Sequence, residues 1–341
     1  MKIFGKNPSK ARQAFFADKS SYKIDRFQNQ LDEPLINVST LEIIKGYFNR
    51  PKNIIPNGLV PSLKTNLKTM TCDKPTVVWF GHSSYLIKHK NISVLVDPVF
   101  CGYSSPFSFY AKAFKGSNNY QVRDLPLIDY LVISHDHYDH LDYETMVKLK
   151  DLVKQVITPL GLGSHLEYWG WETSKIIELD WEEKFVSSDS SVTLIATTAM
   201  HSSGRGLATC KTLWTSYVLE LDGNKFFLGG DSGYGPHFSE IGEKYGPFDL
   251  AILENGQYNL MWHHVHLLPH ECIMAAKDLK ASVLFPIHWG KFCLAYHPWN
   301  EPIKKIWQEA KINKIQLTSP MIGEPYTIGS EPKDKIWWDF D

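Results

Sequence analysis

The sequence predicts an α/β protein, a four-layer αββα sandwich in which two mixed sheets pack face to face between outer helices. Two observations predict this fold class. Short β-rich runs first follow one another as a meander, and strands then alternate with helices. The same scheme occurs a second time further along the 341 residues. We expect an irregular N-terminal wrap over residues 1–75 and one sandwich domain over residues 76–341.

The first meander is expected to begin at Thr76. Proline and glycine break the preceding residues into short segments, such as a helix predicted over Thr40–Tyr47. Three β-rich runs separated by three-residue links then predict neighbouring strands. These runs are Thr76–Phe80, Ser84–Lys88 and Ile92–Val96.

Strands and helices alternate after this meander, which is typical of parallel strands with helices on the outside. The predicted order is strand Tyr130–Ser134, helix Tyr143–Leu152, strand Val156–Pro159, helix Gly161–Trp169 and strand Lys175–Glu178.

The second half repeats the scheme. Its meander is predicted over Val192–Thr197, Thr215–Leu221 and Lys225–Leu228. The alternating stretch that follows comprises helix His237–Tyr245, strand Leu250–Leu253, helix Pro269–Leu279, strand Ser282–Ile287 and helix Glu301–Lys311.

The charge distribution is uneven, although the net charge is only −1. Residues 1–75 carry 13 Lys and Arg against 6 Asp and Glu, a net of +7, so the remaining residues carry −8. A basic arm on an acidic body can associate with anionic surfaces, which makes this segment a candidate for peripheral membrane contact. It lacks the interleaved aromatic and basic residues of nucleic-acid platforms, and we expect no nucleic-acid partner.

Composition and cysteine usage predict the cellular context. With 21% charged and 43% hydrophobic residues the chain falls in the globular range, which excludes wholesale disorder. Five scattered cysteines without a Cys-x-x-Cys pair indicate reduced thiols. The start has no signal-peptide core, and no apolar run approaches the ~20 residues of a membrane-spanning helix. We expect a cytoplasmic protein, peripheral at the inner membrane face if the basic arm binds lipid; the oligomeric state stays open.

The strongest chemical signal directly follows the first predicted strand of the alternating stretch. Three histidines and three aspartates lie within Ser134–Asp142. His135 and His137 are two apart and project the same way from a strand end, while Asp139 and His140 follow a turn. Such a set addresses two adjacent ions, which hydrolytic sites hold ~3.5–4 Å apart. Imidazole and carboxylate without thiolate suit zinc, and also manganese or iron.

Other ligand-type residues end later strands. His201 follows the run Val192–Thr197, Asp231 ends a run that contains two glycines, and His288 ends the last predicted strand. Sites in α/β sheets assemble beyond the carboxyl ends of strands, so we expect these residues to join the cluster.

This pattern of His-x-His-x-Asp-His, a lone His, Gly-Gly-Asp and a late His resembles the metallo-β-lactamase superfamily. Within it, the chain is similar to N-acylphosphatidylethanolamine-hydrolysing phospholipase D and its bacterial relatives. The matching stretches lie in the same order between about residues 76 and 300. They are Trp79–Ser84, Leu95–Pro98, Ile133–Tyr143, Ser203–Gly206, Thr212–Trp214, Gly230–Tyr234, Tyr245–Asp249 and Ile287–Gly290.

The resemblance implies a catalytic domain with two bound Zn²⁺ ions, Mn²⁺ or Fe being alternatives, and a metal-bound hydroxide as nucleophile. Asp97 would orient a metal-binding histidine, and His82 would be a polar neighbour of the site, although both residues also suit turns. The implied ligands are His135, His137 and His201 at one ion, Asp139, His140 and His288 at the other, and Asp231 as the bridge.

The substrate end of the site carries fewer signals. His266 matches a histidine near the scissile group in the phospholipase relatives, so we count it with Asp139 and Asp231 as a candidate catalytic residue. Arg205, in a Gly-Arg-Gly loop, is a candidate phosphate ligand through its bidentate guanidinium. The stretch Glu254–Tyr258 departs from the Pro-x-Gly-Ala-Tyr of that branch, close to the expected substrate pocket.

The leading hypothesis is a dinuclear metal hydrolase, a phosphodiesterase acting on N-acylphosphatidylethanolamine-like or other phosphodiester substrates. The alternative is a lactonase or another metal-dependent hydrolase of a small phosphorylated metabolite. Di-iron redox chemistry is disfavoured, because those relatives carry glutamate at the position of His137 and a flavin domain. A non-catalytic metal-binding module is the remaining alternative. The expected partner is a small-molecule or lipid substrate.

Overall fold

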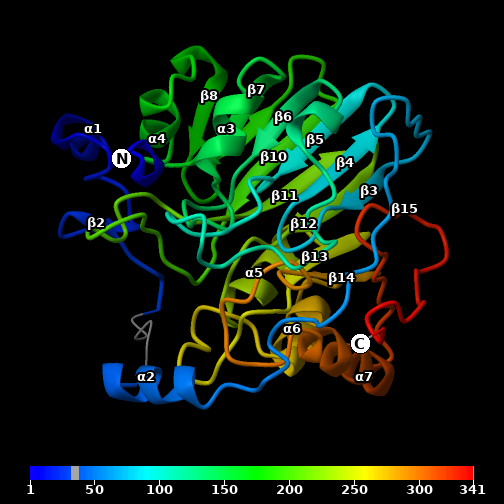
Figure 1. Ribbon diagram of the computed structural model, residues 1–341. Coiled ribbons are helices and arrows are strands. Elements are labelled where there is room, and N and C mark those ends of the chain that lie inside the picture. The colour runs from blue at the N-terminus through cyan, green and yellow to red at the C-terminus, as the bar shows by residue number, and fades with distance from the viewer. Residues whose placement is uncertain (32–37, 341) are drawn as a thin grey trace.

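The computed structural model describes residues 1–31 and 38–340 (Figure 1). Two large sheets pack face to face with helices on their outer sides, which confirms the predicted four-layer αββα sandwich. None of the helices in the described ranges has the length and apolarity needed to cross a bilayer.

The seven-stranded sheet has the order β15-β3-β4-β5-β6-β7-β8. Its meander β3–β5 is antiparallel, and β5 to β8 run parallel. Helices α3 (Tyr143–Leu149) and α4 (Gly163–Tyr168) cover its outer face. The strands are β3 (Thr76–Trp79), β4 (Tyr85–His89), β5 (Ile92–Val96), β6 (Ile128–Val132), β7 (Val153–Pro159), β8 (Ile176–Leu179) and β15 (Pro325–Thr327).

The six-stranded sheet has the order β14-β13-β12-β11-β10-β9. Strands β12, β13 and β14 run parallel, and α6 packs against β13 and between α5 and α7. The strands are β9 (Lys184–Val186), β10 (Val192–Thr197), β11 (Ser216–Leu221), β12 (Asn224–Leu228), β13 (Leu250–Glu254) and β14 (Leu284–Ile287); the helices are α5 (His237–Lys244), α6 (Pro269–Asp278) and α7 (Glu301–Asn313).

Strand β3 shows why these runs are continuously apolar. Val77 and Trp79 belong to the core that joins the two sheets, whereas Val78, and Phe80 directly after the strand, belong to the core beneath α3 and α4. Because successive side chains point to opposite faces, a strand covered on both sides needs apolar residues at every position.

The N-terminal segment lies along the sandwich as a series of short elements. Phe16, Tyr22 and Phe27 pack with Leu213 and Trp214 in a small core of their own. The division at residue 75 stays a prediction, and its residues 32–37 lie outside the described ranges. The elements are η1 (Lys2–Phe4), α1 (Lys10–Ala14), β1 (Tyr22–Lys23), β2 (Arg26–Phe27) and α2 (Thr40–Phe48).

Strand β6 differs from its predicted span, beginning at Ile128 and ending at Val132. The strand ends early because the amide and hydroxyl of Ser134 both donate to the Asp97 carboxylate, at 2.8 and 2.6 Å, and the chain leaves the ladder there. Strands β9 and β15 and the β1–β2 hairpin are additions that the sequence did not predict; each strand has two or three residues.

Candidate metal centre

The parallel strands of both sheets end at one edge of the sandwich, and the ligand-type side chains gather there. Every one of these side chains stands in a loop that follows the carboxyl end of a strand. Asp97 follows β5, the loop from His135 to His140 follows β6, and His201, Asp231 and His288 follow β10, β12 and β14.

Gly230 permits two of these loops to approach each other. Its φ of 59° lies in the left-handed region that favours glycine. A Cβ at this position would lie 2.8 Å from the Cβ of Ser134. Any side chain would therefore push Asp231 away from the loop that follows β6.

Three imidazoles form the first donor group. His137 Nδ1 lies 3.0 Å from Nε2 of His135 and 3.2 Å from Nε2 of His201. The Nδ1 atoms of His135 and His201 have partners of their own, so their Nε2 atoms can offer lone pairs beside His137 Nδ1. The ligand atoms of the three rings all lie within 4.8 Å of one another. Three convergent imidazole nitrogens are a typical partial shell for a transition-metal ion.

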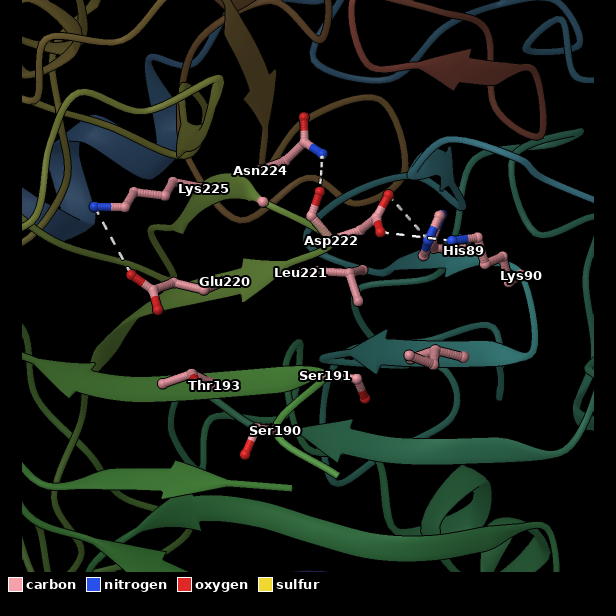
Figure 2. A pocket seen from close by; sticks show the side chains of 12 residues that line it. His89, Lys90, Ser190, Ser191, Thr193, Glu220, Leu221, Asp222, Asn224 and Lys225 are labelled. Atoms are coloured by element: carbon pink, nitrogen blue, oxygen red, sulfur yellow. Dashed lines mark hydrogen bonds and ion pairs between the residues drawn. The ribbon is translucent and has the colours of Figure 1, made fainter. Parts of the chain in front are cut away.

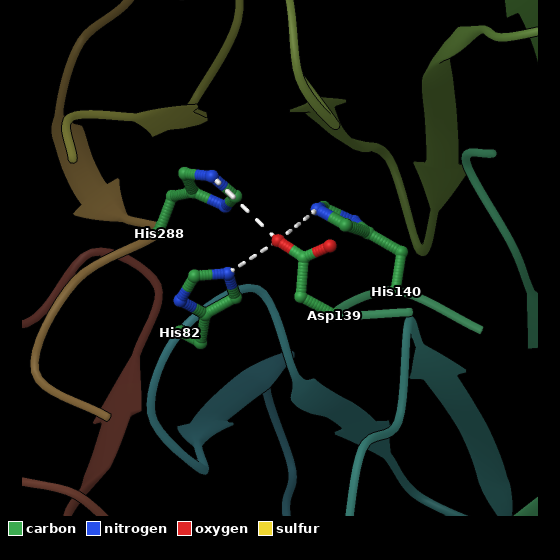
Figure 3. A group of neighbouring side chains, drawn as sticks. All are labelled: His82, Asp139, His140 and His288. Carbon is green, nitrogen blue, oxygen red and sulfur yellow. Dashed lines mark hydrogen bonds and ion pairs between the residues drawn. The ribbon is translucent and has the colours of Figure 1, made fainter. Parts of the chain in front are cut away.

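The second donor group centres on Asp139 (Figure 3). Its Oδ2 lies 2.9 Å from His82 Nε2, 3.6 Å from His140 Nε2 and 4.0 Å from His288 Nε2. Asp231 stands between the two groups, because its Oδ2 lies 3.1 Å from His140 Nε2 and 3.8 Å from His201 Nε2. The structure thus brings all seven predicted ligands together, with His82 as an additional neighbour.

Hydrogen bonds to Nδ1 fix the orientation of four of the rings, leaving each Nε2 for the donor cluster, as is usual around protein-bound metals. Asp97 Oδ2 holds Nδ1 of His140, while Asp97 Oδ1 accepts a hydrogen bond from the Ser134 amide. The Nδ1 partners are Ser134 Oγ for His135 (3.0 Å), Asp97 Oδ2 for His140 (2.8 Å), the Val265 carbonyl for His201 (3.0 Å) and Ser83 Oγ for His288 (2.7 Å).

The electrostatics of the cluster favour neutral imidazoles that offer lone pairs. Burial, reinforced by neighbouring rings, holds the pKa of His135 and His201 well below its ordinary value. His140 is the exception, because nearby carboxylates overcome burial and hold its pKa well above the ordinary value. Burial also raises the pKa of Asp231 to about 7.

The donor set fits a metal ion. His140 Nε2 and Asp231 Oδ1 are buried and make no hydrogen bond of good geometry among the described residues, although they lie 3.1 Å from Asp231 Oδ2 and 3.2 Å from His288 Nδ1, respectively. Buried polar atoms without partners are costly, and a coordinated cation would satisfy both. Nitrogen and carboxylate oxygen donors without a thiolate suit zinc, iron or manganese.

Besides Gly230, three residues around the donor groups have left-handed backbone conformations. The φ angles are 53° for His82, 40° for Asp97 and 67° for His288. Such conformations are uncommon outside glycine and persist where the surrounding contacts impose them, often at functional sites.

A cavity of about 330 Å³ opens beside the donors. His266 stands in its wall, where its ring stacks on His288 at a centroid distance of 5.3 Å. The residues that line the cavity are His137, Asp139, His201, Ser202, Asp231, Gln257, Trp262, Val265, His266, His288 and Leu294.

Glu254 is a site residue that the sequence analysis did not assign. Its Oε2 lies 2.6 Å from His266 Nδ1, and its Oε1 accepts a hydrogen bond from the Ser232 amide. The side chain is fully buried, and burial raises its pKa, whereas the amides of Ser232 and Leu267 and the nearby His140 favour its ionised form. A signal was available, since Glu254 directly follows the predicted strand Leu250–Leu253, and Asp231 lies three residues beyond the predicted strand Lys225–Leu228.

Arg205 lies elsewhere than expected. The sequence suggested a phosphate ligand, but its side chain is 2% exposed and is not among those that line the cavity. Its guanidinium donates to the carbonyl oxygens of Asp136, Leu141 and Ile3 and lies over the Tyr138 ring. Both Nη atoms are committed to the protein's own backbone, and the side chain does not reach the cavity, which corrects the predicted role in substrate binding.

A second, larger cavity of about 500 Å³ lies at the amino ends of β5 and β12, away from the donors. Figure 2 shows its charged side chains facing one another. Lys225 lies 3.8 Å from Glu220, and Asp222 lies 3.2 Å from His89 and 3.6 Å from Lys90. Because the charged side chains of this cavity contact partners of their own, we assign no function to it.

Comparison with known proteins agrees with this geometry. The beta-lactamase superfamily domain matches residues 93–289. The solved structure of Igni18, a metallo hydrolase of Ignicoccus hospitalis, shares the fold with a TM-score of 0.56 at 19% identity, covering 75% of this chain and 99% of that one. The chain belongs to the metallo-β-lactamase superfamily and is a metal-dependent hydrolase.

Within the superfamily, the chain is similar to N-acylphosphatidylethanolamine-hydrolysing phospholipases D. N-acyl-phosphatidylethanolamine-hydrolyzing phospholipase D 1 of Caenorhabditis elegans is 33% identical over 227 residues, which cover 63% of this chain and 63% of that enzyme. An uncharacterised protein of Mycobacterium tuberculosis is 35% identical over 287 residues, or 83% of this chain and 77% of that protein.

Proposed function

We propose that the protein is a dinuclear zinc hydrolase that cleaves a phosphodiester bond, in an N-acylphosphatidylethanolamine-like lipid or another phosphodiester. The observation that carries this proposal is the pair of donor groups that share Asp231. Two ions held there would activate water at neutral pH and offset the negative charge of a phosphoryl group. The similarity to a phospholipase D supports the choice of bond.

His266 is the candidate group for contact with the substrate. Its Nδ1 is held by Glu254, so Nε2 is the ring nitrogen left for a substrate oxygen. From the cavity wall it is placed to hydrogen-bond a phosphoryl oxygen or to give a proton to the leaving group.

A second candidate is hydrolysis of a lactone or of another small phosphorylated metabolite. The observation that favours it is the cavity lining, where no lysine or arginine is found among the described residues. Trp262, Val265 and Leu294 form an apolar part of the wall instead. A neutral ester would need no cation beyond the bound metal.

An activity screen distinguishes the two candidates. Protein with a defined zinc content is assayed against soluble phosphodiesters, N-acylphosphatidylethanolamine in vesicles and a panel of lactones. The proposal expects kcat/KM to be highest for a phosphodiester. Higher kcat/KM for a lactone or neutral ester would overturn it in favour of the second candidate.

We also propose a cytoplasmic location with peripheral contact to anionic membranes through the N-terminal segment. Helix α2 supports this proposal, because Leu41, Ile44 and Phe48 are 60%, 48% and 78% exposed beside the basic Lys45. Apolar insertion combined with basic residues is typical of interfacial helices. Tyr296 contacts α2 through its hydrogen bond to the Ile43 carbonyl and also packs against Trp262 of the cavity wall.

Co-sedimentation with vesicles tests this contact. Phe48→Ser should weaken binding to anionic vesicles. Leu127→Ser is the control and should not weaken it, because it also replaces an exposed apolar side chain by serine, at a 64% exposed position outside α2. Added salt should weaken binding further, since exposed charges are screened within ~8–10 Å. Equal binding by both variants would contradict the assignment.

A further inference from the structure

Arg205 is one of the most completely enclosed cations of the structure, and the proposed reaction does not use it. One Nη atom donates to the carbonyl oxygens of Asp136 and Leu141, each at 2.7 Å. These two residues bracket His137, Asp139 and His140 in the chain. The guanidinium therefore joins the start and the end of the loop that carries the candidate ligands.

Asp136 adds a second set of contacts under the same loop. Its Oδ1 accepts from the Gly204 amide at 2.6 Å, and its Oδ2 accepts from Thr212 Oγ1 at 3.0 Å and from His165 Nε2 at 3.1 Å. Asp136 and His165 are both buried. The carboxylate thus ties the loop to α4 and to the segment around Arg205.

The first residues of the chain complete this arrangement. The other Nη atom of Arg205 donates to the Ile3 carbonyl at 2.8 Å, and the Lys6 amide donates to His165 Nδ1 at 2.9 Å. Because Nδ1 accepts, a neutral His165 must carry its hydrogen on Nε2, which is the atom that donates to Asp136. The Trp169 indole adds a 2.8 Å bond to the Lys2 carbonyl.

We propose that Arg205, Asp136 and His165 form a buried brace that positions the metal-binding loop 135–141, and that residues 2–6 are part of this brace. Arg205 and His165 are then positioning residues, acting on the ligands through backbone atoms and through Asp136. Partners in the layer outside metal ligands affect metal affinity about 10- to 100-fold. The inference rests on the proposed metal centre and is independent of which bond is hydrolysed.

Gly5 offers a selective way to disturb the brace. Its φ is 67°, and a Cβ there would lie 2.2 Å from His165 Nδ1, far inside van der Waals contact. Gly5→Ala should therefore displace residues 2–6 from His165. Gly223→Ala is the matched control, because Gly223 has a similar φ of 75° with nothing within 4 Å of its Cβ position.

Arg205→Met tests the brace directly, with Arg12→Met as its control. Arg12 also anchors the N-terminal segment, but through ion pairs with Glu167 and Glu178 at 2.8 and 3.0 Å, away from the metal-binding loop. Each variant is checked for folding by circular dichroism. Zinc affinity is then measured by competition with a chromophoric chelator, and the absorption spectrum of the Co²⁺-loaded protein reports the coordination geometry.

Arg205→Met and Gly5→Ala should each weaken zinc binding by about 10-fold or more and alter the Co²⁺ spectrum, while both controls keep wild-type values. Unchanged affinity and spectrum in folded Gly5→Ala, or equal losses in the controls, would overturn the proposal. If Arg205→Met fails to fold, the comparison of Gly5→Ala with Gly223→Ala alone tests the brace. These readouts need no substrate, so a wrong choice of scissile bond would leave them intact and be recognised separately.

Discussion

At the scale of single residues, Glu254 determines which ring nitrogen of His266 carries the hydrogen. An ionised carboxylate can only accept a hydrogen bond, so the 2.6 Å contact places the hydrogen of His266 on Nδ1 and leaves Nε2 for the cavity. An amide at this position could keep its oxygen on the Ser232 amide and turn its NH₂ toward the ring. The ring would then have to accept at Nδ1 and carry its hydrogen on Nε2. The nitrogen that faces a substrate would change from a hydrogen-bond acceptor to a donor.

Glu254→Gln should therefore lower kcat by about 10²-fold or more, the usual contribution of a positioned acid or base, with a smaller change in KM. The wild-type and variant kcat and KM are compared on the best substrate of the screen. Glu271→Gln is the control, since that carboxylate caps α6 through the Leu268 amide instead of holding His266. Equal losses in both variants would show that Glu254 acts only on stability.

Lys291 is a fully buried cation whose Nζ donates to the carbonyl oxygens of Val99 and Phe80, at 2.8 and 3.3 Å. Burial lowers its pKa from 10.5 to about 7. Between these two values the unfolded chain binds a proton that the folded protein does not. The free energy of unfolding should therefore rise with pH in this window, by up to about 1.4 kcal/mol per pH unit.

Lys291→Met removes this dependence. We expect the stability of the wild type, measured relative to this variant by urea denaturation, to increase from pH 7 to pH 10. Subtracting the variant removes the contribution of the other titrating groups. Parallel stability curves for the two proteins would contradict the prediction.

At the scale of elements, the C-terminal segment covers the residue next to a candidate ligand. Trp289 follows His288 and stacks on Trp337 at a centroid distance of 5.1 Å, with Trp338 edge-on at 5.9 Å. The Asn300 side chain donates to the Trp338 carbonyl and holds this segment against the start of α7. The tail thus stabilises the loop after β14 from outside the sheet.

Trp338→Ala should lower the free energy of unfolding by about 3–5 kcal/mol, because it removes a large side chain that is only 2% exposed. Ile336→Ala, at a 51% exposed position two residues away, should change it by no more than about 0.5 kcal/mol. Urea denaturation measures both. Similar values for the two variants would mean that the tail is not an integral part of the core.

At the scale of the whole molecule, the candidate ligands come from both sheets. The loop after β6 supplies His135 through His140, while the loops after β10, β12 and β14 supply the others. Ions bound at this edge would join the two halves of the sandwich. Binding to the folded state alone stabilises it, by about 4 kcal/mol at a thousandfold excess over Kd.

Unchelated protein should therefore contain two transition-metal ions per chain by elemental analysis. Chelation should lower Tm and abolish hydrolysis, and two equivalents of zinc should restore both. Asp139→Ala should fold, retain about one ion and lose turnover. One ion or none in the unchelated wild type would contradict the dinuclear proposal.

The sequence by itself determined the fold class and the grouping of the ligand-type residues. The apolar periodicity and the positions of proline and glycine located most elements. Strand β6 ends two residues before its predicted end, because Ser134 bonds to Asp97 instead of continuing the ladder. The ligand cluster was predictable because its members are contiguous, as in His135–His140, or end a recognisable strand. Parallel strands bring such ends to one edge whatever the details of packing.

Only the tertiary structure decided the roles of Arg205 and Glu254. Arg205 bonds to Ile3, 202 positions away, and Glu254 acts through His266 across a turn. A guanidinium in a glycine-rich loop has the same local sequence whether it faces a substrate or the backbone of a distant segment. Which of these it does depends on how the loop packs, because a buried cation takes whatever acceptors the folded chain places around it.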